Sequence, residues 1–154
     1  MRDNNVNDQI ISNNAMIEME AISENESFAR VVVASFVTSL DPTLEEISDI
    51  KTAVSEAVTN CIIHGYDNNG GTVVMRMQLR GHEFSITIED KAKGIEDIKK
   101  AMEPMYTSCP SQERSGMGFV FMEAFMDELS VESTPGQGTK VHMKKIIQDV
   151  AVSD

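Results

Sequence analysis

The chain has 154 residues, 41% of them hydrophobic and 25% charged, which suits one soluble globular domain with a core of its own. Its formal net charge of −12 argues against nucleic acid or an anionic membrane as a partner, and favours a basic protein partner. The sequence shows no signal peptide or membrane-spanning run, and its two cysteines form no CxxC pair, so we expect a cytoplasmic protein without structural zinc.

The first predicted elements are a strand and a helix. Residues 1–13 are rich in Asn and Asp and predict a disordered tail. Alternating apolar residues over 17–21 predict a short strand. Ser23 and Glu26 have the spacing of a capping box and predict a helix of about 17 residues that ends before Pro42. Its apolar face is expected to comprise Phe28, Val31, Val32, Phe36, Val37 and Leu40.

A second helix is predicted from Thr43, which again has a capping-box partner in Glu46, to the glycine at position 65. Glu56 and Asn60 lie one turn apart on this helix, away from its apolar stripe. An Asn amide oxygen can ligate Mg²⁺, and a glutamate can accept a proton from a hydroxyl group. The same spacing is also common on solvated helix faces, so the pair alone does not establish a site.

Two alternating segments, 72–79 and 83–90, predict a pair of strands joined by a turn at Gly81. By the period of two, Asp90 continues the buried face of Phe84, Ile86 and Ile88. A buried carboxylate is costly unless a partner satisfies it, which makes Asp90 a candidate for binding an exocyclic amine of a base. The alternative is an aspartate that caps the following turn.

The remaining segments predict a short helix at 94–102, a loop at 103–117, a helix from 118 to 126, and strands at 129–133 and 139–146. Gly116 and Gly118 precede the last helix, where glycines and free N–H groups suit a phosphate but also suit an ordinary turn. Residues from 148 onward are expected to fray. The fold class is therefore one α/β domain over residues 14–147, with helices covering one face of a mixed, mainly antiparallel sheet.

Four short motifs occur in the order ExxxN, DxxxG, GxG and GT, at residues 56–60, 90–94, 116–118 and 138–139. In this order they resemble the GHKL superfamily of ATP-binding domains, which implies the two-layer Bergerat-type sandwich. Longer segments resemble the anti-sigma F factor family, and the resemblance covers roughly residues 16–147. These segments are Asn25–Arg30, Val54–Tyr66, Glu113–Phe119 and Phe125–Glu128.

The resemblance implies a serine kinase that binds and inhibits sporulation sigma factor F in an ATP-loaded state and phosphorylates a serine of the anti-anti-sigma factor. It also implies a homodimer. Glu56 would be the catalytic base, Asn60 would hold Mg²⁺, and residues 103–118 would form a lid over ATP. The implied nucleotide-binding residues are Asn60, Asp90, Gly94, Thr107, Ser115, Gly116, Met117, Gly118 and Thr139. The implied partner-contact residues are Arg30, Glu113 and Arg114.

One position departs from the resemblance. Relatives usually carry a glycine where Ala92 stands, and acidic or small residues in place of Lys91. If the backbone at position 92 required a positive φ, the alanine would be strained there, whereas a glycine would not. Three other functions stay open. The first is a stress-response anti-sigma kinase that acts on another sigma factor. The second is the catalytic module of a sensor kinase, although this chain has no phospho-accepting histidine on a preceding dimerisation helix. The third is a kinase-dead module that binds ATP only as a structural ligand.

Overall fold

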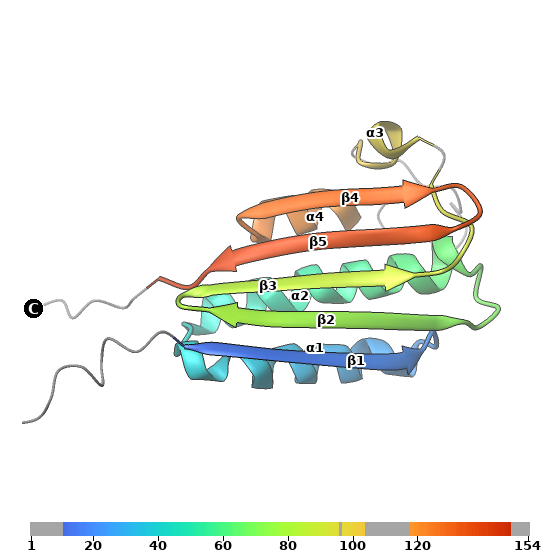
Figure 1. Ribbon diagram of the computed structural model, residues 1–154. Coiled ribbons are helices and arrows are strands. Elements are labelled where there is room, and N and C mark those ends of the chain that lie inside the picture. The colour runs from blue at the N-terminus through green and yellow to red at the C-terminus, as the bar shows by residue number, and fades with distance from the viewer. Residues whose placement is uncertain (1–10, 96, 104–117, 149–154) are drawn as a thin grey trace, which may run out of the picture.

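Five strands form one sheet in the order β1-β2-β3-β5-β4 in the computed structural model, which describes residues 11–95, 97–103 and 118–148 (Figure 1). The strands are β1 Ser12–Glu20, β2 Thr72–Arg80, β3 Glu83–Asp90, β4 Glu128–Thr134 and β5 Gly138–Ile146. Each pairing of neighbouring strands in this sheet is antiparallel, so the sheet that was expected to be mainly antiparallel is antiparallel throughout. Helices α1 and α2 lie between β1 and β2 along the chain, and β5 rather than β4 takes the place beside β3.

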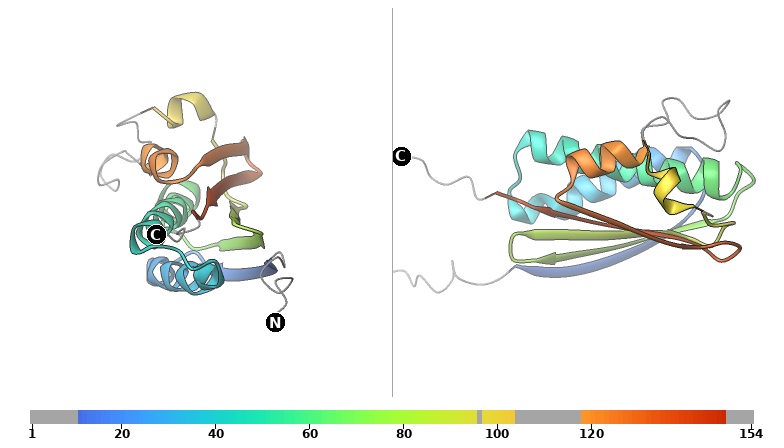
Figure 2. Two further views of the ribbon diagram at one scale, coloured as in Figure 1. Left: turned by 90° about the vertical axis from the view of Figure 1, so that its left-hand side faces the viewer. Right: turned by 90° about the horizontal axis from the view of Figure 1, so that it is seen from above.

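The helices are α1 Glu24–Phe36, α2 Leu44–Asn60, α3 Ile98–Ala101 and α4 Gly118–Phe125. A 3₁₀ turn, Val37–Leu40, extends α1, and a π turn, Cys61–Gly65, extends α2. Helices α1, α2 and α4 lie on one face of the sheet, and α2 packs between the other two (Figure 2). The predicted two-layer α/β sandwich is therefore confirmed.

The core lies between the sheet and this helical layer. Alternate residues of β2 and β3 are buried, because successive strand side chains point to opposite faces. They form one cluster with Ile50 and Val54 of α2 and Val33 of α1. The buried strand residues are Val73, Met75, Met77, Leu79, Phe84, Ile86 and Ile88.

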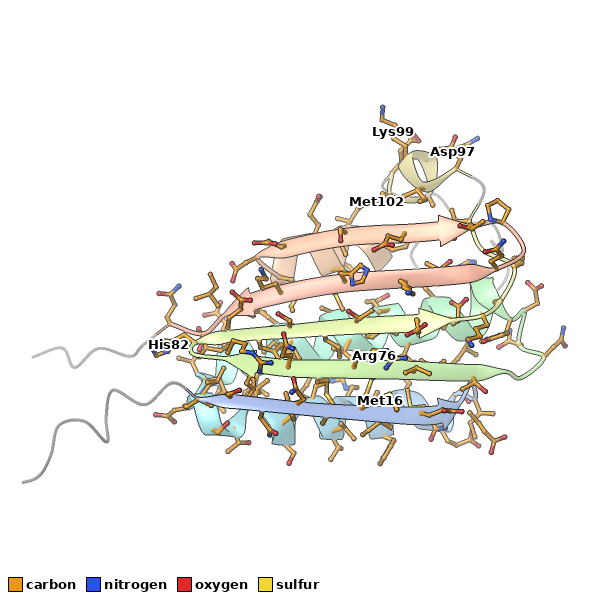
Figure 3. All side chains as sticks on the ribbon, viewed as in Figure 1. Met16, Arg76, His82, Asp97, Lys99 and Met102 are labelled. Carbon is orange, nitrogen blue, oxygen red and sulfur yellow. The ribbon has the colours of Figure 1, made fainter. Side chains whose placement is uncertain are left out.

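Among the described residues, no helix covers the other face of the sheet (Figures 1 and 3). Met16 and Arg76 lie on this face, and Arg76 Nε is 3.0 Å from Glu89 Oε1 on the adjacent strand. A one-sided antiparallel sheet with polar residues facing outward explains why the strand sequences alternate.

Helix α1 is rotated relative to the sequence-based expectation. Its buried residues are Ala29 and Val33, whereas Phe28 and Val31 are 47% and 67% exposed. Ser23 makes no capping bond through its side chain, so the first capping box is wrong. Glu26 instead accepts hydrogen bonds from Ser55 Oγ and Thr59 Oγ1 of α2, at 2.8 and 2.7 Å. These bonds between the two helices fix the face that α1 turns toward α2.

The second capping box is confirmed, because Glu46 N donates to Thr43 Oγ1 at 3.1 Å and Thr43 N donates to Glu46 Oε1 at 2.9 Å. Strand β1 begins at Ser12, two residues inside the expected tail, because it pairs with β2 along its full length. At the other end, Gln148 N donates to Glu46 Oε2 at 2.9 Å, so Gln148 is held rather than frayed. Within the described residues, no helix is both long and apolar enough to cross a bilayer.

Candidate functional site

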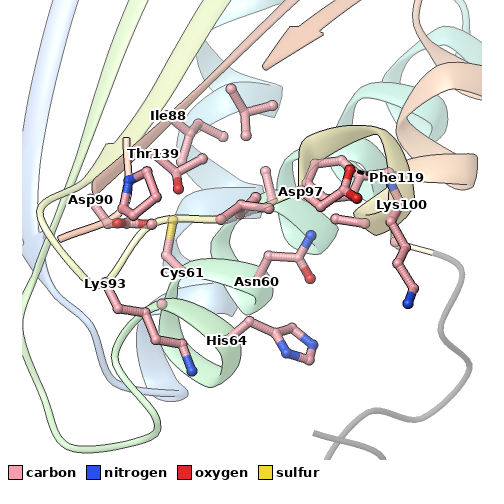
Figure 4. A pocket seen from close by; sticks show the side chains of 18 of the residues that line it. Asn60, Cys61, His64, Ile88, Asp90, Lys93, Asp97, Lys100, Phe119 and Thr139 are labelled. Atoms are coloured by element: carbon pink, nitrogen blue, oxygen red, sulfur yellow. Dashed lines mark hydrogen bonds between the residues drawn. The ribbon is translucent and has the colours of Figure 1, made fainter. Parts of the chain in front are cut away.

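A cavity of about 690 Å³ lies where the last turn of α2, the end of β3, the start of β5 and the start of α4 meet (Figure 4). This volume is in the range of small-molecule sites in proteins. The predicted residues Asn60, Asp90, Gly94, Gly118 and Thr139 all line it. The other lining residues are Ala57, Cys61, His64, Gly65, Ile88, Lys93, Ile95, Asp97, Lys100, Ala101, Phe119, Pro135, Gly136 and Val141.

Asn60 and Glu56 lie against the first residue of α4. A Cβ atom built on Gly118 would lie 3.2 Å from Asn60 Nδ2 and 3.4 Å from Glu56 Oε2. Because glycine has no side chain, the start of α4 fits closely against both polar groups. The predicted Glu56–Asn60 pair is therefore placed beside a helix N-terminus, which carries a partial positive charge. Asn60 is drawn within the cavity in Figure 4.

Asp90 ends β3 on its buried face and is 6% exposed, as the period of two predicted. Its Oδ1 accepts a hydrogen bond from Ala92 N at 3.0 Å. Burial raises the pKa of Asp90, while hydrogen bonds from the Ala92 backbone, the Cys61 side chain and the Thr139 backbone act in the opposite direction. A carboxylate held by three donors has remaining lone pairs for a ligand donor.

Cys61 is 4% exposed and lines the cavity beside Asp90. Burial raises the pKa of the Cys61 thiol well above its usual range, and the charge of Asp90 adds to this rise. The Cys61 thiol donates a hydrogen bond to the Asp90 carboxylate, and Figure 4 shows its sulfur beside that side chain. Helical periodicity placed Cys61 on an apolar face and gave no sign of this contact.

Thr139 lies opposite Asp90 in the β3–β5 pairing. Its Oγ1 is 2.8 Å from Ser133 Oγ, which accepts a hydrogen bond from Ile95 N at 2.7 Å. Gly138 has a φ of +116°, and a side chain there would collide with the Asp90 carbonyl oxygen. The β4–β5 turn thus closes tightly against the end of β3, which explains the glycine of the GT motif.

Gly94 has a φ of +78°, and a side chain there would collide with the Thr134 carbonyl oxygen. A hydrogen bond also joins the loop after β3 to the β4–β5 turn, because Gly136 N donates to Lys93 O at 2.6 Å. Ala92 is not among the described residues with positive φ, so the alanine at this position introduces no backbone strain. Lys93 Nζ pairs with Asp67 Oδ1 at 3.1 Å beside the cavity.

Several predicted site residues cannot be placed. The lid residues Thr107, Glu113, Arg114, Ser115, Gly116 and Met117 lie outside the described residues. Arg30 lies on α1 and is not one of the residues that line the cavity. Sequence reasoning also missed His64 and Phe119, whose positions in the cavity depend on the π turn and on how helix α4 packs.

The donor set fits a metal ion bound through phosphate rather than a protein cage. Within the described residues, no three His, Cys, Asp or Glu side chains gather as a metal site. Mg²⁺ usually takes one or two protein oxygen atoms and completes its shell with phosphate and water. The Asn60 amide oxygen, next to Glu56 and Gly118, is compatible with that arrangement.

Comparison with known proteins agrees with this geometry. The chain matches the histidine kinase-like ATPase domain family over residues 19–145. It is 58% identical over 134 residues to the anti-sigma F factor of Thermoanaerobacter sp. (strain X514), covering 86% of this chain and 94% of that one. It is 59% identical over 136 residues to the anti-sigma F factor of Clostridium acetobutylicum, covering 88% and 95%. The chain belongs to the anti-sigma F factor family.

Solved structures share the fold of this anti-sigma F factor family member. The RsbU and RsbW domains of Rv1364c from Mycobacterium tuberculosis align with a TM-score of 0.63 at 20% identity, covering 88% of this chain and 32% of that one. A histidine kinase domain from Erythrobacter litoralis EL346 aligns with a TM-score of 0.52 at 20% identity, covering 79% and 60%. At this identity the two likenesses establish the fold alone.

Proposed function

We propose that this protein is an ATP-dependent serine kinase that phosphorylates an anti-anti-sigma factor, and that its ATP-loaded form binds and inhibits sporulation sigma factor F. The observation that carries the proposal is the cavity lined by Asp90, Asn60 and Gly118, with the Glu56 carboxylate beside Gly118. The anti-sigma F factors of Thermoanaerobacter and Clostridium acetobutylicum, which are nearly 60% identical, support the biological role.

In the proposed complex, the adenine amino group donates to Asp90, and Thr139 closes that side of the pocket. Gly94 lets the loop after β3 run close to the base. The phosphates extend toward Asn60 and the start of α4, whose free N–H groups favour an anion. Thr107, Ser115, Gly116 and Met117 belong to the segment proposed to cover the nucleotide.

The proposed chemistry depends mainly on positioning. Mg²⁺, when bound, neutralises charge on the phosphates, and Asn60 is the residue that would hold it. Glu56 would accept the proton of the substrate serine, because its carboxylate lies beside Asn60 across Gly118. The buried environment around Asp90 fixes the base, so the terminal phosphate is presented to the serine in one orientation.

The net charge of the protein supports the proposed partners. A net charge of −12 suits a basic patch on a sigma factor and disfavours direct contact with nucleic acid or an anionic membrane. Phosphorylation adds negative charge to the anti-anti-sigma factor, which weakens its contact with an acidic kinase. Arg30, Glu113 and Arg114 are the proposed contact residues, and the protein is expected to act in the cytoplasm as a homodimer.

The test is transfer of labelled phosphate from [γ-³²P]ATP to a purified anti-anti-sigma factor. We expect Mg²⁺-dependent labelling of one serine in the substrate and none when that serine is replaced by alanine. ATP binding without any labelling would contradict the kinase assignment and support the kinase-dead alternative. Co-purification of the sigma subunit with the ATP-loaded protein tests the inhibitory role separately.

A further inference from the structure

Cys61 is the side-chain donor that holds the carboxylate proposed to recognise the base. It follows Asn60 directly, begins the π turn, and is 4% exposed. Figure 4 shows its sulfur beside Asp90 within the cavity lining. The hydrogen bond between Cys61 and Asp90 links the end of α2 to the end of β3.

Three donors from three different segments fix the Asp90 carboxylate. They are the Ala92 N–H after β3, the Thr139 N–H of β5, and the Cys61 thiol of the π turn. On the other side, a Cβ atom at Gly65 would lie 3.1 Å from Asp90 Oδ2. Two of these donors are backbone groups that remain after most substitutions. Cys61 is the donor that depends on the identity of a side chain.

The thiol limits what Asp90 can recognise. An ionised carboxylate only accepts hydrogen bonds, and a thiol donor directed at it favours the ionised form. Adenine presents an amino donor at its 6-position, whereas guanine and hypoxanthine present an acceptor oxygen there. A carboxylate held as an acceptor therefore attracts a 6-amino group and is repelled by a 6-oxo group.

We propose that Cys61 is a specificity-determining residue, which orients Asp90 so that the cavity selects 6-aminopurine nucleotides over other purine nucleotides. This inference rests on the proposed function, because it requires a nucleotide base at Asp90. Cys61 acts through Asp90 and so is a positioning residue. A cysteine that only filled space would affect all purine nucleotides equally.

The test compares ATP with purine riboside 5′-triphosphate, which lacks only the 6-amino group, and with GTP. Dissociation constants are measured by calorimetry with Mg²⁺ for the wild type, Cys61→Ala and Cys61→Ser. We expect the wild type to favour ATP over purine riboside triphosphate by about tenfold, the size of one hydrogen bond. In Cys61→Ala this ratio should fall to about threefold or less, with little change for purine riboside triphosphate. Cys61→Ser, which keeps a donor of similar size, should restore the ratio.

If Cys61→Ala leaves the ratio of the two dissociation constants unchanged, whether it weakens ATP and purine riboside triphosphate equally or weakens neither, the inference is overturned. If the alanine variant does not fold, the comparison uses Cys61→Ser and Cys61→Val, which differ in the donor, and the valine variant should have the lower ratio. A wild type that binds none of the three nucleotides would instead overturn the proposed function. A wild type that binds them with the expected preference, but variants that keep it, would contradict only the role of Cys61.

Discussion

The buried carboxylate of Asp90 lowers the free energy of unfolding of the unliganded protein at neutral pH. Burial raises its pKa, so the folded protein binds the Asp90 proton more tightly than the unfolded chain does. Between the ordinary pKa of an aspartate and the raised one, stability therefore increases as the pH falls. At neutral pH the ionised carboxylate is a net cost to folding, which is common for groups in functional sites.

Replacing Asp90 with Asn should therefore raise the melting temperature of the unliganded protein at pH 7 and weaken ATP binding by about tenfold, the size of one hydrogen bond. The stability gap between the two proteins should narrow on acidification, because protonation relieves the same cost in the wild type. Thermal unfolding across pH and calorimetry with ATP measure both effects. A variant that is less stable than the wild type at pH 7 would show that the carboxylate is net stabilising.

Replacing Glu56 with Gln should reduce phosphate transfer by at least about 100-fold, the typical contribution of a general base. Nucleotide affinity should change little, because the amide keeps the size of the side chain beside Gly118. Glu45→Gln, an exposed residue in the first turn of the same helix, is the matched control and should leave transfer unchanged. Transfer by Glu56→Gln at the wild-type rate would exclude Glu56 as the base.

Single positions were predictable where one local rule governs them. Asp90 follows from strand alternation, and Thr43 with Glu46 follows from the capping box. Cys61 was not predictable as a partner of Asp90, because its thiol meets β3 only through the packing of α2 on the sheet. The lid residues proposed from the resemblance stay predictions, since they lie outside the described residues.

Helices α1 and α2 show how a tertiary contact overrides a local signal. The Ser23–Glu26 spacing is the same as that of Thr43–Glu46, yet only the second pair forms a capping box. Glu26 binds two hydroxyl groups of α2 instead, and α1 turns Ala29 and Val33 inward. A rule that considers one helix at a time cannot detect this competition.

Replacing Glu26 with Ala should therefore lower the free energy of unfolding by about 1–3 kcal/mol, because the buried Ser55 hydroxyl loses its acceptor. Glu26→Gln keeps an acceptor oxygen and should cost less. Glu24→Ala, at an exposed position two residues earlier, is the control and should be close to neutral. Urea denaturation measures all three, and equal values for Glu26→Ala and Glu24→Ala would contradict the proposed role of these bonds.

Strand β1 and helix α1 form one margin of the molecule, where a sheet edge lies beside exposed apolar side chains. Strand β1 is at an edge of the sheet, and α1 lies behind it (Figures 1 and 2). Phe28 and Val31 on α1 are exposed large hydrophobic residues. An edge strand next to exposed apolar residues is typical of a protein–protein interface. This margin supports the proposed homodimer.

Replacing Val31 with Lys should raise the dimer dissociation constant at least about tenfold, because the substitution places a charge in an apolar contact. Ile146→Lys is the matched control, since Ile146 is also an exposed apolar residue but lies on β5, away from β1. Analytical ultracentrifugation measures the dissociation constants. If Val31→Lys and Ile146→Lys have the same dimer dissociation constant, the dimer contact does not lie at α1.

Most of the architecture was predictable because the elements are strongly periodic. The strands from 72 to 90 and the last hairpin were predicted almost to the residue. The all-antiparallel order was not, because strand neighbours depend on the path of the chain across the sheet. The cavity itself arises where residues 60, 90, 118 and 139 meet, and their proximity is a property of the fold rather than of any one segment.

The most direct measurement is a crystal structure of the protein with a non-hydrolysable ATP analogue and Mg²⁺. We expect the base in the cavity, with its amino nitrogen about 3 Å from the Asp90 carboxylate. We also expect Mg²⁺ on the Asn60 amide oxygen at about 2.1 Å. A nucleotide bound outside this cavity, or a base turned away from Asp90, would contradict the account.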